Sequence, residues 1–286
     1  MTEGVTGPTS VTYDYVLGVD EQERTRLLGQ AALHAPEARS LLDRVGLAAG
    51  GHAIDVGCGP LGVLDLLAER VGPTGAVIGL DRDARMLGMA ARSLAERGLQ
   101  EQVQLCQATA GDTALEESFD LCHARLVLVH TPDPMPVITE MVRFTRPGGW
   151  VALEEIDWIS WTCEPPHPGF GVLVDALERV WQRAGLDVHI GRRLEGMLRA
   201  AGLVDVGACA HQKLARPGDL NQTNVLRFVE ICRERLLSAG EFSAGQLDAL
   251  VEALGEHLAR PDTVVLDKLF FQAWGRRPTY PSTSQH

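Results

Sequence analysis

An apolar segment that runs directly into a glycine-rich turn constrains the fold of this chain most strongly. Residues 53–56 read Ala-Ile-Asp-Val, and Gly57, Gly59 and Gly62 follow in the spacing G-x-G-x-x-G. Glycine permits positive φ angles, and its missing side chain lets a ligand approach the backbone closely. The helical pattern over residues 63–70 completes a strand–turn–helix unit. Such a unit predicts an α/β sheet with a ligand site at the carboxyl end of its first strand.

Asp55, two positions before the turn, discriminates between the ligands that such a turn can hold. The glycine spacing and Asp81, at the end of the next apolar segment, also satisfy the dinucleotide fingerprint. A pyrophosphate at the turn would meet the Asp55 carboxylate, and like charges in a poorly hydrated crevice repel. S-adenosylmethionine instead presents an amino group and a sulfonium there, so Asp55 favours it. Asp81 does not discriminate, because it can accept hydrogen bonds from the ribose of any nucleoside cofactor.

Two later landmarks extend the pattern. Residues 119–125 read Phe-Asp-Leu-Cys-His-Ala-Arg, and residues 146–150 read Arg-Pro-Gly-Gly-Trp. In order and spacing, the stretch from residue 50 to 157 resembles the class I S-adenosylmethionine-dependent methyltransferases. The resemblance implies S-adenosyl-L-methionine as cofactor and S-adenosyl-L-homocysteine as product. It also implies a doubly wound, Rossmann-like α/β fold, with a seven-stranded, mostly parallel sheet whose last strand is antiparallel.

Composition limits the partners and the location. The chain has 286 residues, of which 45% are hydrophobic, and a formal net charge of −12. The basic residues form no stripe, so a nucleic-acid partner is disfavoured. No apolar run reaches the roughly twenty residues of a membrane span, and the first residues do not resemble a signal peptide. We therefore expect a cytoplasmic protein that acts on a small molecule, without a membrane partner. Whether it forms a homodimer is left open.

The order of the predicted elements divides the chain into four parts. Helical patterns precede the first strand, strands and helices then alternate to residue 157, and further helices lie between candidate strands at 204–213 and 263–275. Long connections without secondary structure are uncommon, so these helices are assigned to a lid. The predicted parts are an N-terminal helical cap (1–49), the cofactor-binding core (50–157), the end of the core with an inserted helical lid (158–276), and a flexible tail (277–286).

The resemblance also assigns cofactor contacts. The turn and Asp55 face the methionine portion, Asp81 faces the ribose, and Arg82 covers the adenine. Arg125 flanks the methionine portion or forms a salt bridge in solvent. The adenine amino group is expected near Ala108 and Thr109, although Asp112 is an alternative. The complete predicted set is Asp55, Gly57, Cys58, Gly59, Asp81, Arg82, Ala108, Thr109 and Arg125.

Candidates for the acceptor side come from histidines and aromatic residues. Histidine acts as a general base near neutral pH, and His130 follows the fourth strand at the ligand edge, while His189 lies in the lid region. Either could instead be structural. Three tryptophans follow the fifth strand, where they can stack on an acceptor or form the core of the lid. With Tyr15, the predicted substrate-binding set is Tyr15, Trp158, Trp161 and Trp181. No convincing ligand set for a metal is present, so none is predicted.

Together these features favour methyl transfer from S-adenosylmethionine to a small metabolite of secondary metabolism that is aromatic or bears an amine. The attacking atom, whether oxygen, nitrogen or carbon, is left undetermined. Two alternatives remain: an NAD(P)-dependent oxidoreductase, which rests on the glycine spacing and Asp81 alone, and a non-catalytic S-adenosylmethionine-binding protein.

Overall fold

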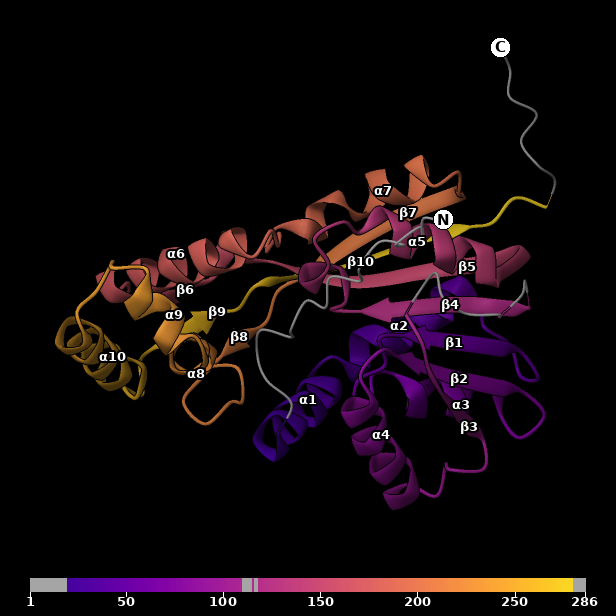
Figure 1. Ribbon diagram of the computed structural model, residues 1–286, viewed down its shortest axis with the longest axis horizontal. Helices are drawn as coiled ribbons and strands as arrows, with labels where there is room; N and C mark the ends of the chain where they lie inside the picture. Colours follow the sequence, from indigo (N-terminus) through magenta and orange to yellow (C-terminus); the bar gives the residue numbers. More distant parts are fainter. Residues whose placement is uncertain (1–19, 110–114, 116–117, 280–286) are drawn as a thin grey trace, which may run out of the picture.

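A twisted seven-stranded sheet forms the centre of the molecule (Figure 1). The computed structural model describes residues 20–109, 115 and 118–279. The strand order is β3-β2-β1-β4-β5-β10-β7, and all neighbours pair in parallel except β10, which is antiparallel to both β5 and β7. The predicted fold class is thereby confirmed. The strands are β1 His52–Val56, β2 Ala76–Asp81, β3 Val103–Gln107, β4 Phe119–Arg125, β5 Thr145–Asp157, β7 Val204–His211 and β10 Leu269–Arg276.

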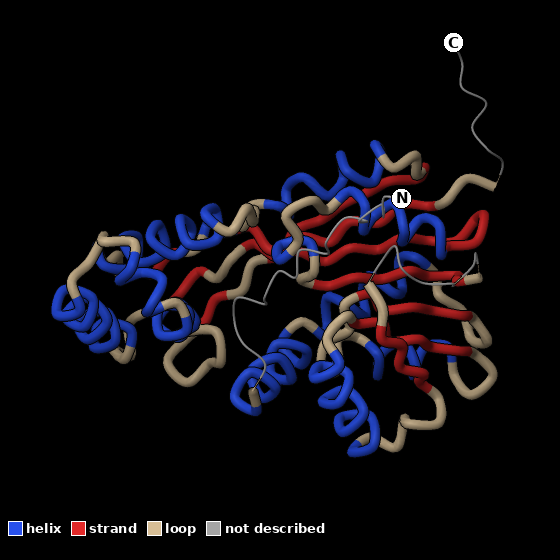
Figure 2. The backbone as a smooth tube through the Cα atoms, viewed as in Figure 1, coloured by secondary structure: helices blue, strands red, loops and turns tan. Residues whose placement is uncertain are grey.

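Helices cover both faces of this sheet, as the alternation of elements predicts (Figure 2). On β1, Ala53 packs toward one helical layer and Ile54 toward the other, because successive side chains of a strand point to opposite faces. The first layer contains α2 Ala35–Val45, α3 Leu64–Val71 and α4 Ala84–Glu96. The second contains α5 Met135–Phe144, the short helix η1 Leu128–His130, and α7 Leu194–Ala200, which follows η3 Ile190–Arg193.

The two N-terminal helices begin and end where local signals place them. Helix α1, Glu21–Leu33, starts at Asp20, whose side chain accepts a hydrogen bond from the backbone N–H of Glu23 at 2.8 Å. Helix α2 ends at Gly46, which adopts a φ of +66°. Side-chain capping and a left-handed glycine satisfy backbone groups that a helix end leaves without partners. Both boundaries therefore follow from the residues at the helix ends.

A separate cap extends from one end of the sheet (Figure 1). We define the cap as residues 158–188 and 212–268. It has its own three-stranded sheet in the order β6-β9-β8 and its own hydrophobic core. Its elements are η2 Trp158–Ser160, β6 Thr162–Glu164, α6 Pro168–Arg183, β8 Leu214–Ala215, α8 Asn224–Ile231, α9 Arg233–Ser238, α10 Ala244–Leu258 and β9 Val264–Leu266. The predicted boundaries of the four parts remain a prediction.

The single strand expected over residues 263–275 is wrong. The segment forms two strands in different sheets, since β9 pairs within the cap and β10 within the central sheet. Asp267 separates them: its backbone N–H donates to the Lys213 carbonyl at 2.9 Å, and its side chain accepts from the Lys268 N–H at 2.8 Å. Along the described residues, no helix combines the length and the apolarity needed to cross a bilayer.

Candidate cofactor and acceptor site

The glycine turn is fixed to the strand beside it. The backbone N–H groups of Gly57 and Cys58 donate to the Leu80 carbonyl at 2.7 and 3.0 Å. A Cβ on Gly57 would lie 2.5 Å from Val127 Cγ2, and one on Gly62 would lie 2.2 Å from Asp55 Oδ2. A Cβ on Gly59 would meet nothing within 4 Å. Protein packing therefore demands the outer two glycines, whereas the middle one faces open space that a ligand can enter.

Asp81 joins the end of β2 to this turn. Its Oδ2 accepts a hydrogen bond from the Gly59 N–H at 2.9 Å, and its Oδ1 accepts from the Asp83 N–H at 2.9 Å. Burial raises the pKa of Asp81. The Ala108 N–H donates to the Asp81 carbonyl at 3.1 Å, so the end of β3 lies beside it. Arg82 and Thr109 are exposed next to these residues, and Asp112 lies outside the described residues.

Asp55 lies beneath the turn, inside the protein. Its Oδ2 accepts a hydrogen bond from the Val63 N–H at 3.2 Å, and its Oδ1 is 2.8 Å from His123 Nδ1. The other ring nitrogen of His123, Nε2, is 3.2 Å from Glu154 Oε2. Both nitrogens face carboxylates, so both must carry hydrogen. Although burial lowers the pKa of His123, Asp55 and Glu154 together raise it to about 9. His123 is therefore an imidazolium at neutral pH, and it balances the charge of Asp55.

The same network continues across the sheet to the N-terminal helices. Gln272 on β10 donates to Glu154 Oε1 at 2.5 Å and to the Glu37 carbonyl on α2 at 2.8 Å. Arg125 donates from Nη2 to the Gly62 carbonyl at 2.5 Å, and its Nη1 is 3.9 Å from Glu154 Oε2. Arg125 is buried, so it contacts the glycine turn and does not form a salt bridge in solvent. Sequence reasoning missed His123, although a histidine inside an apolar strand is an unusual signal.

A second buried carboxylate organises the turn after β4. Glu155 accepts hydrogen bonds from the N–H groups of Val127 at 2.8 Å, Leu128 at 2.6 Å and Val129 at 3.4 Å. Burial raises the pKa of Glu155 to about 8. This turn ends at His130, whose pKa falls to about 3 because of burial and the positive charges of Arg26 and Arg82. His130 is thus neutral at pH 7 near the ligand edge. Its catalytic role remains a prediction.

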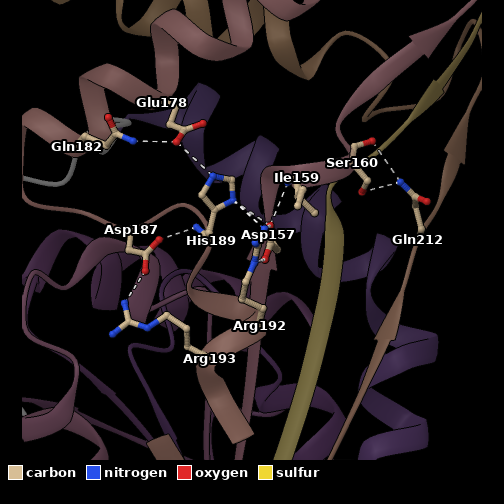
Figure 3. Close-up of polar contacts among 10 residues, drawn as sticks. All are labelled: Asp157, Ile159, Ser160, Glu178, Gln182, Asp187, His189, Arg192, Arg193 and Gln212. Atoms are coloured by element: carbon tan, nitrogen blue, oxygen red, sulfur yellow. Dashed lines mark hydrogen bonds and ion pairs between the residues drawn. The ribbon is translucent and has the colours of Figure 1, made fainter. Parts of the chain in front are cut away.

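His189 belongs to an ion-pair cluster between the sheet and the cap (Figure 3). Its Nδ1 is 2.9 Å from Asp157 Oδ1 at the end of β5, and its Nε2 is 3.2 Å from Glu178 Oε1 on α6. Arg192 donates from Nη2 to the same Asp157 Oδ1 at 2.6 Å. Burial raises the pKa of Asp157, but Arg192 and His189 outweigh it and hold that pKa below its usual value. These contacts join α6 to the central sheet, and catalysis by His189 remains a prediction.

The three predicted tryptophans pack against one another inside the cap. The Trp158 ring centroid lies 5.1 Å from that of Trp161 and 5.3 Å from that of Trp181. All three are buried in the cap's hydrophobic core. Within the part of the chain that the structure describes, the Nε1 atoms of Trp158 and Trp161 are enclosed without a hydrogen-bond partner. Direct contact of these rings with an acceptor remains a prediction, and Tyr15 lies outside the described residues.

A small cavity lies between α1, the ligand edge of the sheet and the cap. Its walls include Arg26, His34, Ile156, Asn224, Lys268 and Phe270. Trp161 contacts one residue of this wall, since the Lys268 Nζ lies 4.0 Å from the centroid of the Trp161 ring. The cavity offers about 20 Å³ of space for water, which suits one water-sized group. Since its walls come from segments far apart in the sequence, no local motif could have revealed it.

Similarity to known proteins agrees with this geometry. Residues 47–181 match a methyltransferase domain family. The chain is 33% identical over 186 residues to a demethylmenaquinone methyltransferase from Geobacillus stearothermophilus, covering 60% of this chain and 79% of that protein. The chain belongs to the class I S-adenosylmethionine-dependent methyltransferases. The family expected from the sequence is confirmed.

Two further proteins show how far the likeness extends. The nocamycin O-methyltransferase of Saccharothrix syringae is 40% identical over 119 residues, which are 41% of this chain and 42% of that one. A geranyl diphosphate methyltransferase solved with S-adenosylmethionine has a TM-score of 0.52 at 19% identity, covering 90% of this chain and 91% of its own, and so shares the fold. The chain spans only about half the length of several other curated relatives that it matches.

Proposed function

We propose that this protein transfers the methyl group of S-adenosylmethionine to a small-molecule acceptor, with S-adenosylhomocysteine as the product. The observation that carries the proposal is the glycine turn bound to Asp81. The Asp81 carboxylate holds the Gly59 N–H, and Gly59 faces open space at the carboxyl ends of β1 and β2. Ligands of doubly wound sheets bind at this edge. A solved structure of similar fold that contains S-adenosylmethionine supports this choice of cofactor.

In the proposed complex, residues at neighbouring strand ends divide the cofactor between them. Asp81 binds the ribose, Ala108 and Thr109 lie beside the adenine, Arg82 covers it, and the methionine portion lies over the glycine turn. Arg125 supports that portion, because it holds the Gly62 carbonyl. Asp55 lies beneath the turn and accepts a hydrogen bond from the Val63 N–H. His123 compensates the negative charge of Asp55.

We further propose an aromatic or amine-bearing metabolite as the acceptor. It would approach the sulfonium from the side of α1 and the cap, where Ile156 and Phe270 line the cavity. Methyl transfer is an in-line displacement, so the protein mainly positions the two reactants and excludes water. Relatives named for demethylmenaquinone and nocamycin support a small-molecule acceptor and a place in secondary metabolism. The cytoplasmic location, the exclusion of nucleic-acid and membrane partners, and a homodimer remain predictions from the sequence.

Calorimetry with S-adenosylhomocysteine and NAD tests the cofactor. We expect the wild-type protein to bind S-adenosylhomocysteine and the Asp81→Asn variant to bind it at least about tenfold more weakly, because a charged hydrogen bond is lost. Asp262→Asn is the matched control, since Asp262 is exposed in the cap and pairs only with Arg260 among the described residues. Tight binding of NAD without binding of S-adenosylhomocysteine would overturn the proposal. Transfer of labelled methyl groups to phenols, amines and indoles then tests catalysis.

A further inference from the structure

Leu126, the first residue after β4, has a backbone conformation that residues with a side chain rarely adopt. Its φ is +56°, and among the described residues Asp205 is the other non-glycine residue with a positive φ. In this left-handed conformation the Cβ approaches the following carbonyl oxygen too closely, so the conformation is strained. Backbone strain persists only where the surrounding structure enforces it, and it is common at functional sites. The strain at Leu126 therefore calls for a cause and a purpose.

The residues on either side of Leu126 contact the two ends of the glycine turn. Before it, Arg125 donates from Nη2 to the Gly62 carbonyl at 2.5 Å. After it, Val127 packs on Gly57, since a Cβ on Gly57 would lie 2.5 Å from Val127 Cγ2. The bend at Leu126 thus places both of its neighbours against the turn over which the methionine portion of the cofactor is proposed to lie.

Strand β5 enforces this bend through two consecutive residues. The Leu126 N–H donates to the backbone carbonyl of Glu154 at 2.8 Å. The next two N–H groups, those of Val127 and Leu128, donate to the side chain of Glu155 at 2.8 and 2.6 Å. Both of these bonds end at the same oxygen, Oε1. Three successive N–H groups are therefore held by β5, and the chain cannot continue β4 in an extended conformation.

Glu155 is a costly residue at this position unless its acceptor oxygen is needed. Its side chain is completely buried, and burial raises its pKa to about 8. An apolar side chain of similar size would avoid the cost of enclosing a carboxylate. Oε2 accepts only the Val129 N–H among the described residues, at the longer distance of 3.4 Å. The important group is thus the single oxygen Oε1, which glutamine also provides and an apolar side chain lacks.

We propose that Glu155 is a positioning residue for the cofactor: it holds the strained bend at Leu126, and the bend keeps Arg125 and Val127 against the glycine turn. This inference rests on the proposed function, in which that turn carries S-adenosylmethionine. Glu155 acts through backbone N–H groups and takes no part in the transfer of the methyl group. Without its acceptor oxygen, Leu126 relaxes to a negative φ and the turn loses the support of its two neighbours.

Calorimetry with S-adenosylhomocysteine separates this role from the filling of space. Glu155→Met keeps the volume of the side chain but removes the acceptor, and we expect it to bind at least about tenfold more weakly than the wild type. Glu155→Gln keeps an acceptor oxygen, so its affinity should stay within about threefold of the wild type. The affinities are compared in proteins whose circular dichroism matches that of the wild type.

Three outcomes of this experiment have distinct meanings. Wild-type affinity in Glu155→Met would overturn the positioning role, because space filling alone would then suffice. An affinity of Glu155→Gln as low as that of Glu155→Met would also overturn it, because an acceptor oxygen would then not be what the bend requires. A wild-type protein that does not bind S-adenosylhomocysteine would instead overturn the proposed function itself.

The strain at Leu126 provides a second, independent test. Glycine adopts a positive φ without steric cost, so in Leu126→Gly the bend depends less on Glu155. We expect the double variant Glu155→Met/Leu126→Gly to bind S-adenosylhomocysteine about fivefold or more tightly than Glu155→Met alone. The matched control is Asp205→Gly, which removes the other positive φ, near the start of β7, and should restore nothing. No restoration by Leu126→Gly, or equal restoration by both glycine variants, would overturn the assignment.

Discussion

The region beneath the glycine turn and the interior of the cap bury different kinds of groups. Beneath the turn, Asp55, His123 and Glu154 are enclosed, and every one of them has a charged partner. In the cap, the enclosed groups are aromatic rings, and the indole nitrogens of Trp158 and Trp161 have no partner among the described residues. A satisfied polar network specifies one arrangement, whereas apolar packing tolerates several. The comparison therefore separates a region that is fixed by paired charges from a cap interior that is held by apolar packing.

The largest effect is expected from His123→Asn. Removing the imidazolium leaves the buried Asp55 without its charged partner and leaves Glu154 with only Arg125, and breaking a buried charge pair costs about 3 to 5 kcal/mol of unfolding free energy. Urea unfolding at pH 7 measures this loss, and binding of S-adenosylhomocysteine should weaken in parallel because Asp55 supports the turn. His52→Asn, an exposed histidine at the start of β1, should change little. A fully stable His123→Asn protein would contradict the imidazolium.

The pH dependence of stability gives a second view of the same network. The folded pKa of His123, about 9, lies above its ordinary value of 6.5. Its contribution is complete below pH 6.5 and is lost as the pH rises through 9, a decrease on the order of 3 kcal/mol. Glu155, with its pKa raised to about 8, reduces stability in part of the same range. The free energy of unfolding, measured at each pH from 6 to 10, should therefore decrease less steeply with pH in His123→Asn than in the wild type. It should still decrease, because Glu155 is present in both.

Trp181→Ala should destabilise the cap without changing cofactor binding. Trp181 is almost completely buried, and truncation of such a ring costs about 3 kcal/mol or more. Denaturant unfolding measures the loss, while calorimetry should find the affinity for S-adenosylhomocysteine unchanged. Val172→Ala, on an exposed face of the same helix α6, is the control. Equal losses of stability and cofactor affinity would show that the two regions are not separable.

The variants Gly62→Ala and Gly59→Ala test why the turn requires glycine at each position. Both glycines have a φ near +54°, so both variants carry the same backbone strain. Only the new Cβ at position 62 would collide with a fixed group, Asp55 Oδ2. We expect Gly62→Ala to be less stable than Gly59→Ala by about 2 kcal/mol in the absence of cofactor. Equal unfolding free energies would show that contact with Asp55 is not the reason why position 62 requires glycine.

The smallest effect concerns the junction between sheet and cap. Arg192 is partly exposed, so its pair with the buried Asp157 is screened, and Arg192→Gln should cost less than about 1 kcal/mol at pH 7. Because the pKa of Asp157 is lowered, this contribution is present above pH 4 and disappears as the pH falls further. Urea unfolding at pH 7 and pH 3 measures the difference, with Arg193→Gln, whose pair is more exposed, as control. A difference that does not decrease between pH 7 and pH 3 would contradict the electrostatic origin.

Features encoded by neighbouring residues could be predicted. The glycine turn, the N-cap at Asp20 and the stop at Gly46 all follow from local backbone chemistry. The division of residues 263–275 between two sheets could not, because a strand segment pairs according to partners that are distant in the sequence. The burial of Asp55 was equally hidden, since it depends on His123 from another strand.

The sequence by itself determined the family, the cofactor and the order of the core elements. These depend on periodicity and on glycine positions within single segments. Only the tertiary structure decided that the charge of Asp55 is balanced, that the tryptophans pack within the cap, and that residues of α1, the central sheet and the cap line one cavity. Charge compensation, burial and cavity shape arise between segments that only the folded chain brings together.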